Sequence, residues 1–204
     1  MIVWQIRHGL SCESHAKVKY TNIMKKHHQK FTSKDPGMTI MQSDPYISAT
    51  PDLEINCQCH GEGLVEIKCP PSVPFGETPN NNNYKHLSLN KVTKKVELDK
   101  RSEYYYQIQG QLGVTGRKYT DFFVFTMHGG FHLERIMFDE SFWLRLKENL
   151  TDFWSTFILP ELLLVRIDRP KRILSEESRD LLTIDEIEFD TIFESELHIE
   201  YINT

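Results

Sequence analysis

Two carboxylates and a lysine stand close together in the first third of the chain, at a spacing suited to phosphodiester hydrolysis. Asp52 ends an Ala-Thr-Pro-Asp run, and Glu66-Ile67-Lys68 follows fourteen residues later. Side chains alternate between the two faces of a strand, so Glu66 and Lys68 point to one side and Ile67 to the other. Mg²⁺ prefers oxygen ligands and keeps several waters. Asp52 and Glu66 can supply part of that shell, with Lys68 within reach of an activated water.

The surrounding residues predict an antiparallel pair of strands that carries these groups. Residues 46–50 indicate a strand that ends at Pro51, residues 61–63 have turn chemistry, and residues 64–69 indicate a second strand halted by Pro70 and Pro71. A Glu-x-Lys triplet alone is more often a solvent-facing ion pair. The flanking pattern favours a site here.

A third carboxylate, Glu13, lies on a predicted amphipathic helix. Apolar residues recur there at spacings of three, four and seven: Leu10, Ala16, Tyr20, Ile23, Met24 and His27. Glu13 falls within this stripe, and a carboxylate on a buried face is costly unless it is paired or binds a metal. A metal ligand is the favoured interpretation, and an ion pair with a core lysine or arginine is the alternative.

A second helix is predicted from about Glu103 to Gly113. Its core stripe consists of Tyr105, Ile108 and Leu112, and another face carries Tyr104, Gln107 and Gln111. Gln107 is the candidate for orienting a catalytic water, and Tyr104 is a candidate substrate contact. For Gln111, surface polarity is favoured over substrate binding. Gln109 is expected to be a buried, hydrogen-bonded packing residue.

The remaining elements complete a predicted mixed α/β (α+β) fold. Residues 121–126 and 131–138 indicate two strands, joined as a hairpin by a His-Gly-Gly turn at 128–130. Asp139 is a suitable N-cap for the long amphipathic helix that follows and ends before Pro160. A central mixed sheet flanked by helices is therefore expected.

Four motifs in this order resemble the YqaJ-type viral recombinase family, the lambda-exonuclease-like branch of the PD-(D/E)xK nucleases. They are Gly9, Glu13, Ala16 and Tyr20 on the first helix, then runs 49–52, 63–70 and 105–112. The resemblance covers roughly residues 6–165. It implies a restriction-endonuclease-like core in a nuclease domain spanning residues 1–165, followed by an acidic tail, 166–204.

The resemblance also implies an activity and a set of functional residues. The activity is that of a magnesium-dependent deoxyribonuclease that degrades one strand of duplex DNA from an end, in recombination or DNA processing, with Mn²⁺ as a substitute ion. The implied metal ligands are Asp52, Glu66, the Ile67 carbonyl and the helix-borne Glu13, and Lys68 is the catalytic lysine. Gln107, with Tyr104 three residues before it, matches the family's glutamine helix.

The family's N-terminal segment, which helps to grip the 5′-phosphate end, has no counterpart before the Glu13 helix, and Arg7 lies too close to Gly9 to replace its arginine. A restriction-like endonuclease and a non-catalytic DNA- or partner-binding module are the alternative functions. The family suggests a ring-like trimer and a single-strand annealing protein as partner.

The four cysteines are Cys12, Cys57, Cys59 and Cys69. Cys57, Cys59 and Cys69, with His60, could hold zinc, but their spacing is not a standard zinc pattern. Free cysteines are often small buried groups, and zinc is not expected here. A disulfide framework is not expected either.

The charge is unevenly distributed along the chain. The 204 residues carry a net charge of −5, and residues 174–204 alone carry −9, so residues 1–173 carry +4. Lysines and arginines concentrate in the first helix and in residues 91–101, as phosphate contacts require. The loop 70–90 is a candidate wall of a DNA channel, with an ordinary surface loop as the equal alternative. With no apolar run long enough for a membrane span, a soluble intracellular protein is expected, nuclear in a eukaryotic host.

Overall fold

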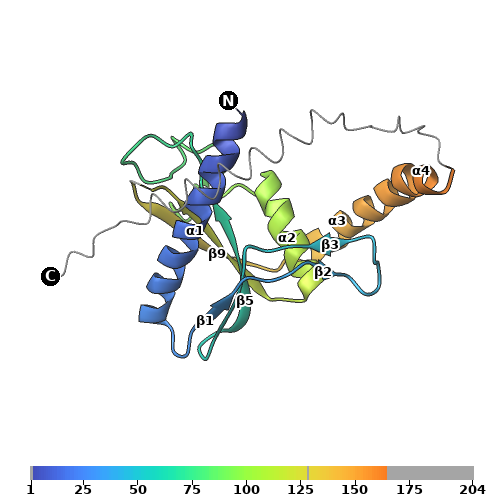
Figure 1. The fold of residues 1–204 in the computed structure, drawn as a ribbon, viewed down its shortest axis with the longest axis horizontal. Helices are drawn as coiled ribbons and strands as arrows, with labels where there is room; N and C mark the ends of the chain where they lie inside the picture. Colours follow the sequence, from blue (N-terminus) through green and yellow to red (C-terminus); the bar gives the residue numbers. More distant parts are fainter. Residues whose placement is uncertain (1, 128, 165–204) are drawn as a thin grey trace, which may run out of the picture. The chain divides into compact units, whose positions relative to one another are not determined.

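The structure is a computed structural model that describes residues 2–127 and 129–164 (Figure 1). The helices are α1 (Ile2–His27), α2 (Glu103–Thr115), α3 (Glu140–Phe153), the π-helix η1 (Trp154–Ile158) and α4 (Leu159–Leu164). The strands are β1 (Thr32–Lys34), β2 (Thr39–Ile40), β3 (Ser48–Ala49), β4 (Leu53–Cys57), β5 (Gly61–Lys68), β6 (Leu87–Leu89), β7 (Val96–Leu98), β8 (Tyr119–Phe125) and β9 (Phe131–Met137).

A five-stranded mixed sheet forms the centre, in the order β1-β4-β5-β8-β9. Neighbouring strands are antiparallel except β5 and β8, which run parallel and are connected through α2. A parallel pair needs such a crossover, because its strands cannot be joined by a tight turn. Two small hairpins, β2-β3 and β6-β7, lie outside this sheet. The expected mixed α/β architecture is confirmed.

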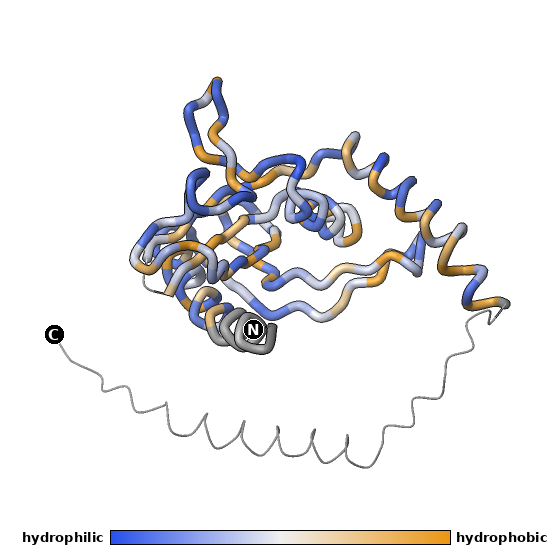
Figure 2. The backbone as a smooth tube through the Cα atoms, turned by 90° about the horizontal axis from the view of Figure 1, so that it is seen from above, coloured by the Kyte–Doolittle hydropathy of each residue, from blue (hydrophilic) through white to orange (hydrophobic). Residues whose placement is uncertain are grey.

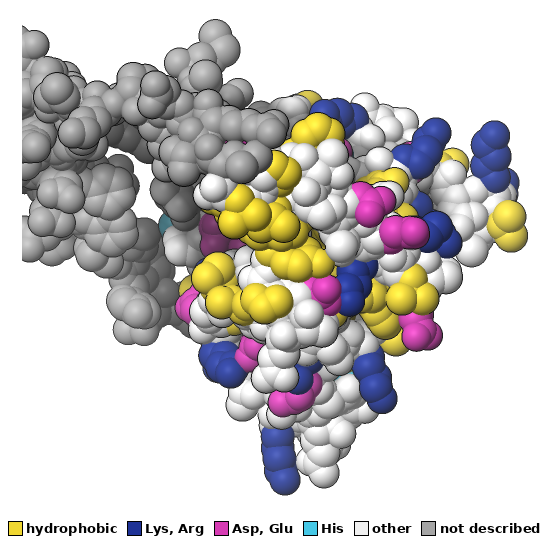
Figure 3. Space-filling model, turned by 90° about the vertical axis from the view of Figure 1, so that its right-hand side faces the viewer, with side chains coloured by type: hydrophobic (Ala, Val, Ile, Leu, Met, Phe, Trp, Pro, Cys, Tyr) yellow, Lys and Arg dark blue, Asp and Glu magenta, His cyan; other side chains and the backbone are white. Residues whose placement is uncertain are grey.

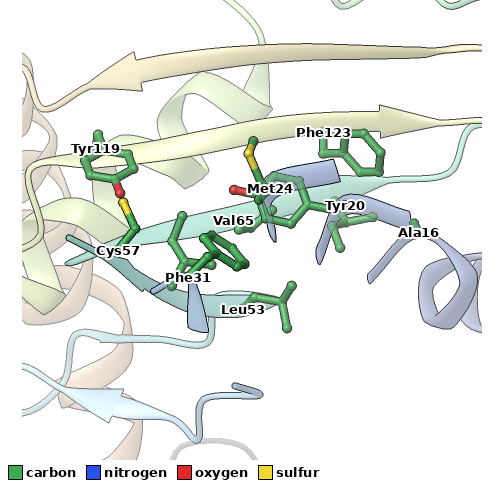
Figure 4. Packing of buried hydrophobic residues seen from close by; sticks show 11 residues of the cluster. Ala16, Tyr20, Met24, Phe31, Leu53, Cys57, Val65, Tyr119 and Phe123 are labelled. Atoms are coloured by element: carbon green, nitrogen blue, oxygen red, sulfur yellow. The ribbon is translucent and has the colours of Figure 1, made fainter. Parts of the chain in front are cut away.

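One helix covers each face of the sheet (Figure 1). Ala16, Tyr20 and Met24 of α1 pack on Val65 and Phe123 in one core cluster, part of which Figure 4 shows. The other cluster joins α2 to the opposite face of the same strands: Leu64, Ile108, Leu112, Phe122 and Val124. Alternate residues of β5 therefore point to different helices, as the period of a strand requires.

A buried polar network fixes α1 on the sheet. The Tyr20 hydroxyl donates a hydrogen bond to Oδ2 of Asp121 on β8 (2.7 Å), and Arg135 on β9 donates from Nε and Nη2 to the same carboxylate at 2.7 and 2.9 Å. Burial, together with the neighbouring carboxylate, raises the pKa of Tyr20, so the phenol stays a donor. The network pairs a buried charge and holds the helix in one position.

The helix ends follow local capping rules. Ser102 caps α2 by accepting a hydrogen bond from the Tyr104 amide, and Gly116 ends it in the left-handed region at φ 68°. The predicted core stripe of α2 is confirmed, with Tyr105, Ile108 and Leu112 buried. Asp139 caps α3, as predicted, by accepting from the Phe142 amide.

The prediction that a strand at residues 46–50 pairs with the strand carrying Glu66 is wrong. Only Ser48–Ala49 forms a strand there, and it pairs with β2. The partner of β5 is β4, which follows Asp52, and the turn lies at residues 58–60 because Gly61 and Gly63 pair within the sheet. Leu53, Ile55 and Cys57 are buried in alternation, which is the pattern of a strand with one face on the core. His27, expected on the buried stripe of α1, is exposed.

The long helix predicted after Asp139 is observed as α3 continued by η1, and hydrophilic and hydrophobic residues alternate along it (Figure 2). From Leu159 onward the chain forms a separate unit, of which α4 is described, and Pro160 lies in its first turn. The proposed acidic tail, residues 166–204, lies outside the described residues. No described helix has the length and apolarity needed to cross a membrane.

Candidate active site

Glu66 is the most deeply buried carboxylate of the predicted site. It lies on β5 with 1% of its surface exposed, and both of its oxygens accept hydrogen bonds. Lys68 Nζ donates to Oε1 at 2.6 Å, and Gln111 Nε2 donates to Oε2 at 2.7 Å. A buried charge is tolerated when it is paired and its lone pairs are occupied. Glu66 is therefore held in a fixed orientation between β5 and α2.

Asp52 stands beside Glu66, at the start of β4. The registered pair Leu53↔Val65 places the preceding Asp52 next to Glu66 on the neighbouring strand, and Asp52 Oδ2 accepts a hydrogen bond from the Ile67 amide at 2.6 Å. Burial and the charges of Glu66 and Glu13 raise the pKa of Asp52 to about 7, against the opposing effects of the Ile67 amide and Lys68. Strongly perturbed carboxylates of this kind concentrate at functional sites.

Lys68 joins the strand to the helix on the same face. Besides its ion pair with Glu66, Nζ donates to Gln107 Oε1 at 3.2 Å and lies 4.4 Å from the centroid of the Tyr104 ring. Its side chain is 21% exposed, so Lys68 is partly accessible to solvent. Three groups on two elements thus hold one cation, including a cation–π contact.

Glu13 is less buried than its helical pattern predicts. Its side chain is 35% exposed and forms an ion pair with Lys17 one turn later, at 3.1 Å. Lys17 also reaches Asp35 at 2.6 Å. The buried side of α1 here is formed by Cys12 and Ala16. Glu13 thus makes an ion pair, though with a surface lysine, and its charge still acts on Asp52.

The glutamines of α2 differ from expectation in one respect. Gln107 is exposed and contacts Lys68, and Gln109 is fully buried between the Met137 carbonyl and the Asp139 amide, as predicted. The prediction that Gln111 is a polar surface residue is wrong, because its side chain is buried (4% exposed) and donates a hydrogen bond to Glu66. Its place one turn after Gln107 on the same helical face was the signal for this contact.

Two cysteines, Cys12 and Cys69, lie next to Glu13 and Lys68 in sequence. Cys12 and Cys69 share a hydrogen bond, which lowers the pKa of Cys12 and raises that of Cys69 together with burial. Cys69 therefore pairs with Cys12, next to Glu13 in sequence, and not with Cys57 and Cys59, the set that was considered for zinc and not expected to bind it.

A cleft of about 920 Å³ opens beside Lys68. Tyr104 and Glu103 of α2 line it together with the segments 69–72 and 81–86. On the side of the molecule that Figure 3 shows, the described lysines and arginines are interspersed with carboxylates and apolar groups and form no continuous basic stripe.

Comparisons with known proteins identify the family and the fold. The model of the YqaJ-like viral recombinase domain matches residues 4–118. Among solved structures, an alkaline exonuclease (LHK-Exo) from Laribacter hongkongensis is 22% identical, with a TM-score of 0.57 over 79% of this chain and 72% of that chain. The same enzyme in complex with dAMP gives 23% identity and a TM-score of 0.53 over 73% and 66%. No curated protein matches the chain.

Proposed function

The chain belongs to the YqaJ-like viral recombinase domain family, and we propose that it is a Mg²⁺-dependent exonuclease hydrolysing DNA from duplex ends. One observation carries the proposal. Two carboxylates on adjacent strands, Asp52 and Glu66, crowd together beside Lys68, at a cost visible in the raised pKa of Asp52. A fold retains such a costly arrangement where a bound cation offsets the repulsion.

The donor set suits a hard divalent cation. Asp52, Glu66, the Ile67 carbonyl and Glu13 offer only oxygen atoms, which Mg²⁺ and Mn²⁺ prefer. Such an ion, when bound, would lower the pKa of a coordinated water and neutralise charge on a phosphate. The residues named would hold it at the end of β5, next to the mouth of the cleft.

The protein's own groups then have distinct roles. Lys68 presents Nζ toward the cleft, where it can exchange a proton with the attacking water or neutralise charge on the scissile phosphate. Gln107 fixes Lys68 and can orient the water through its amide. Gln111 donates a hydrogen bond to Glu66 Oε2 and so holds that carboxylate in one orientation. Water adds to phosphorus and the bond to the 3′-oxygen breaks, which leaves a 5′-phosphate and a 3′-hydroxyl.

The cleft supports a single strand as the occupant. Tyr104 and His86 line the cleft with their rings packed together, centroids 4.3 Å apart, and aromatic groups at such a site contact bases without regard to sequence. Lys85 also lines the cleft and adds a cation for phosphates, beside the asparagines 81–83, two of whose amides donate within the loop. We therefore assign the loop 70–90 as one wall of the DNA path.

The test is cleavage of labelled DNA by Lys68→Ala, with Lys85→Ala as the matched control from the same cleft. We expect Lys68→Ala to abolish magnesium-dependent cleavage and to retain DNA binding, and Lys85→Ala to weaken binding while leaving cleavage at saturating DNA. Unchanged cleavage by Lys68→Ala would overturn the mechanism.

The substrate form separates the related activities. Linear duplexes carrying a 5′-phosphate or a 5′-hydroxyl are compared with closed-circular DNA, each with Mg²⁺, with Mn²⁺ and with chelator. An exonuclease acting on duplex ends leaves closed circles intact. Cleavage of closed circles indicates an endonuclease, and a wild-type chain inert on every form indicates a binding module.

A further inference from the structure

A second cluster of ligating side chains lies at the opposite end of the β4-β5 hairpin from Asp52. It consists of His28, Cys57, Cys59 and His60, whose ligand atoms all lie within 4.8 Å of one another. None of the four takes part in the proposed hydrolysis.

The cluster joins two segments that are far apart in sequence. Cys57 ends β4, Cys59 and His60 lie in the turn before β5, and His28 directly follows α1. A backbone hydrogen bond from the Gln58 amide to the Gln29 carbonyl, 2.9 Å long, holds the turn against the end of the helix. The backbone therefore brings the four side chains together without a bound ion.

We propose that this cluster is a structural Zn²⁺ site of the Cys₂His₂ type. Nδ1 of His28 and Nδ1 of His60 lie 3.8 and 3.7 Å from the Cys57 sulfur. A sulfur and a nitrogen bound to one tetrahedral zinc ion lie about 3.6 Å apart, given bonds of about 2.3 and 2.1 Å. The observed spacing thus needs only small side-chain adjustments to accept the ion.

The donor atoms select the metal. Two thiolates and two imidazoles favour zinc, whereas Mg²⁺ takes oxygen ligands, so this site and the carboxylate site would hold different ions. Four protein ligands leave no open position, which is the arrangement of a structural site. The His60 amide donates to the Cys57 sulfur at 3.3 Å, and such a bond orients a ligating thiolate.

The sequence alone pointed away from this site. The Cys-x-Cys-His run offers three ligands, and Cys69, which seemed the nearest fourth, is engaged with Cys12. The fourth ligand is His28, twenty-nine residues before Cys57. Cys57 is buried and His28 half-buried, while Cys59 and His60 are exposed and leave a path for the ion to enter.

The proposal is tested on the full chain, purified under reducing conditions from medium containing zinc. Metal content is measured by mass spectrometry, and Co²⁺ is substituted to record its tetrahedral d–d and thiolate charge-transfer absorption. We expect about one zinc ion per chain. Cys59→Ala and His60→Ala should each reduce zinc to background, and because both positions are exposed these variants should still fold.

Gln58→Ala, in the same turn, and His27→Ala, beside His28, are the matched controls and should retain the ion. Chelation should lower the melting temperature of the wild type and of both controls, and leave that of Cys59→Ala unchanged. A wild-type chain that neither contains nor binds zinc, or a Cys59→Ala chain that binds it as tightly as the wild type, would overturn the proposal. Neither outcome tests the proposed hydrolysis, which uses none of these four side chains.

Discussion

Replacing Asp52 with asparagine should remove activity and, without divalent ions, make the protein more stable at alkaline pH. Burial beside Glu66 raises the pKa of Asp52 from its ordinary 3.8 to about 7 in the folded state. Each pH unit between these values corresponds to about 1.4 kcal/mol, so ionising this carboxyl costs the folded protein roughly 4 kcal/mol. The amide of the Asp52→Asn variant avoids that cost and can still accept the Ile67 amide hydrogen through its carbonyl oxygen.

The sign of the pH dependence follows from proton binding. Between pH 3.8 and about 7 the folded chain holds the proton of Asp52 and the unfolded chain does not. The free energy of unfolding of the wild type therefore decreases as the pH rises through that window, and above about pH 7 the contribution of Asp52 reaches its full destabilising value. Asp52→Asn lacks the dependence, so the two proteins should be similarly stable at pH 4 and should diverge by roughly 4 kcal/mol at pH 8.

The assay is chemical denaturation of both proteins in chelator at pH 4, 6 and 8, repeated at pH 8 with saturating Mg²⁺. Bound Mg²⁺ should restore the stability of the wild type, because a ligand that binds only the folded state stabilises it, and should leave Asp52→Asn nearly unchanged. An Asp52→Asn protein less stable than the wild type at pH 8 in chelator would contradict this prediction. A difference in the free energy of unfolding that does not change with pH would contradict it as well.

Two further predictions use matched pairs on α2. Gln111→Leu removes a donor from buried Glu66 and should cost about 1.5–3 kcal/mol in the free energy of unfolding, whereas exposed Gln107→Ala should leave stability unchanged and slow cleavage. Gly113→Ala would place its Cβ 2.3 Å from the Trp143 ring and should lower stability by about 1–3 kcal/mol. At Gly110, where the nearest atom would be 3.9 Å away, alanine should add about 0.5–1 kcal/mol. Denaturation curves check each pair, and equal effects within a pair would contradict the prediction.

The long periodic segments were predictable, because the signal of each is contained in its own residues. The helices α2 and α3 show helical spacing over 13 or more residues, and β8 and β9 are seven-residue strands rich in β-branched and aromatic residues on either side of a glycine turn. Their caps and turns are local. The short strands β1, β2, β6 and β7 span two or three residues, too few for a period to appear. Their pairing is fixed by partners elsewhere in the chain.

Strand β4 was missed for a different reason. Leu53, Ile55 and Cys57 alternate with more polar residues, which is a strand pattern. The Pro-Asp run before them was interpreted as the end of a strand at residues 46–50, so no strand was predicted after it. Asp52 instead directly precedes the strand, and it acquires its neighbours through the pairing with β5. Similarly, the contact of Gln111 with Glu66 and that of His28 with Cys57 join residues 45 and 29 positions apart. The helical spacing of Gln107 and Gln111 indicates that they share a face, but it does not identify Glu66 as the partner, and no local pattern indicates the contact of His28 with Cys57.

The β4-β5 hairpin links the two proposed sites through its register. Asp52 and Glu66 are neighbours only because Leu53 pairs with Val65, and a slip of one residue would turn Asp52 to the other face of the sheet. At the far end, Cys57 pairs with Gly61, and three of the proposed zinc ligands lie at and between these two residues. An ion bound by this turn and by the residue that follows α1 would restrain the turn from which the pairing of β4 with β5 begins, and so would stabilise the observed register. The carboxylates that repel each other at one end would then be held together by the bonds made at the other.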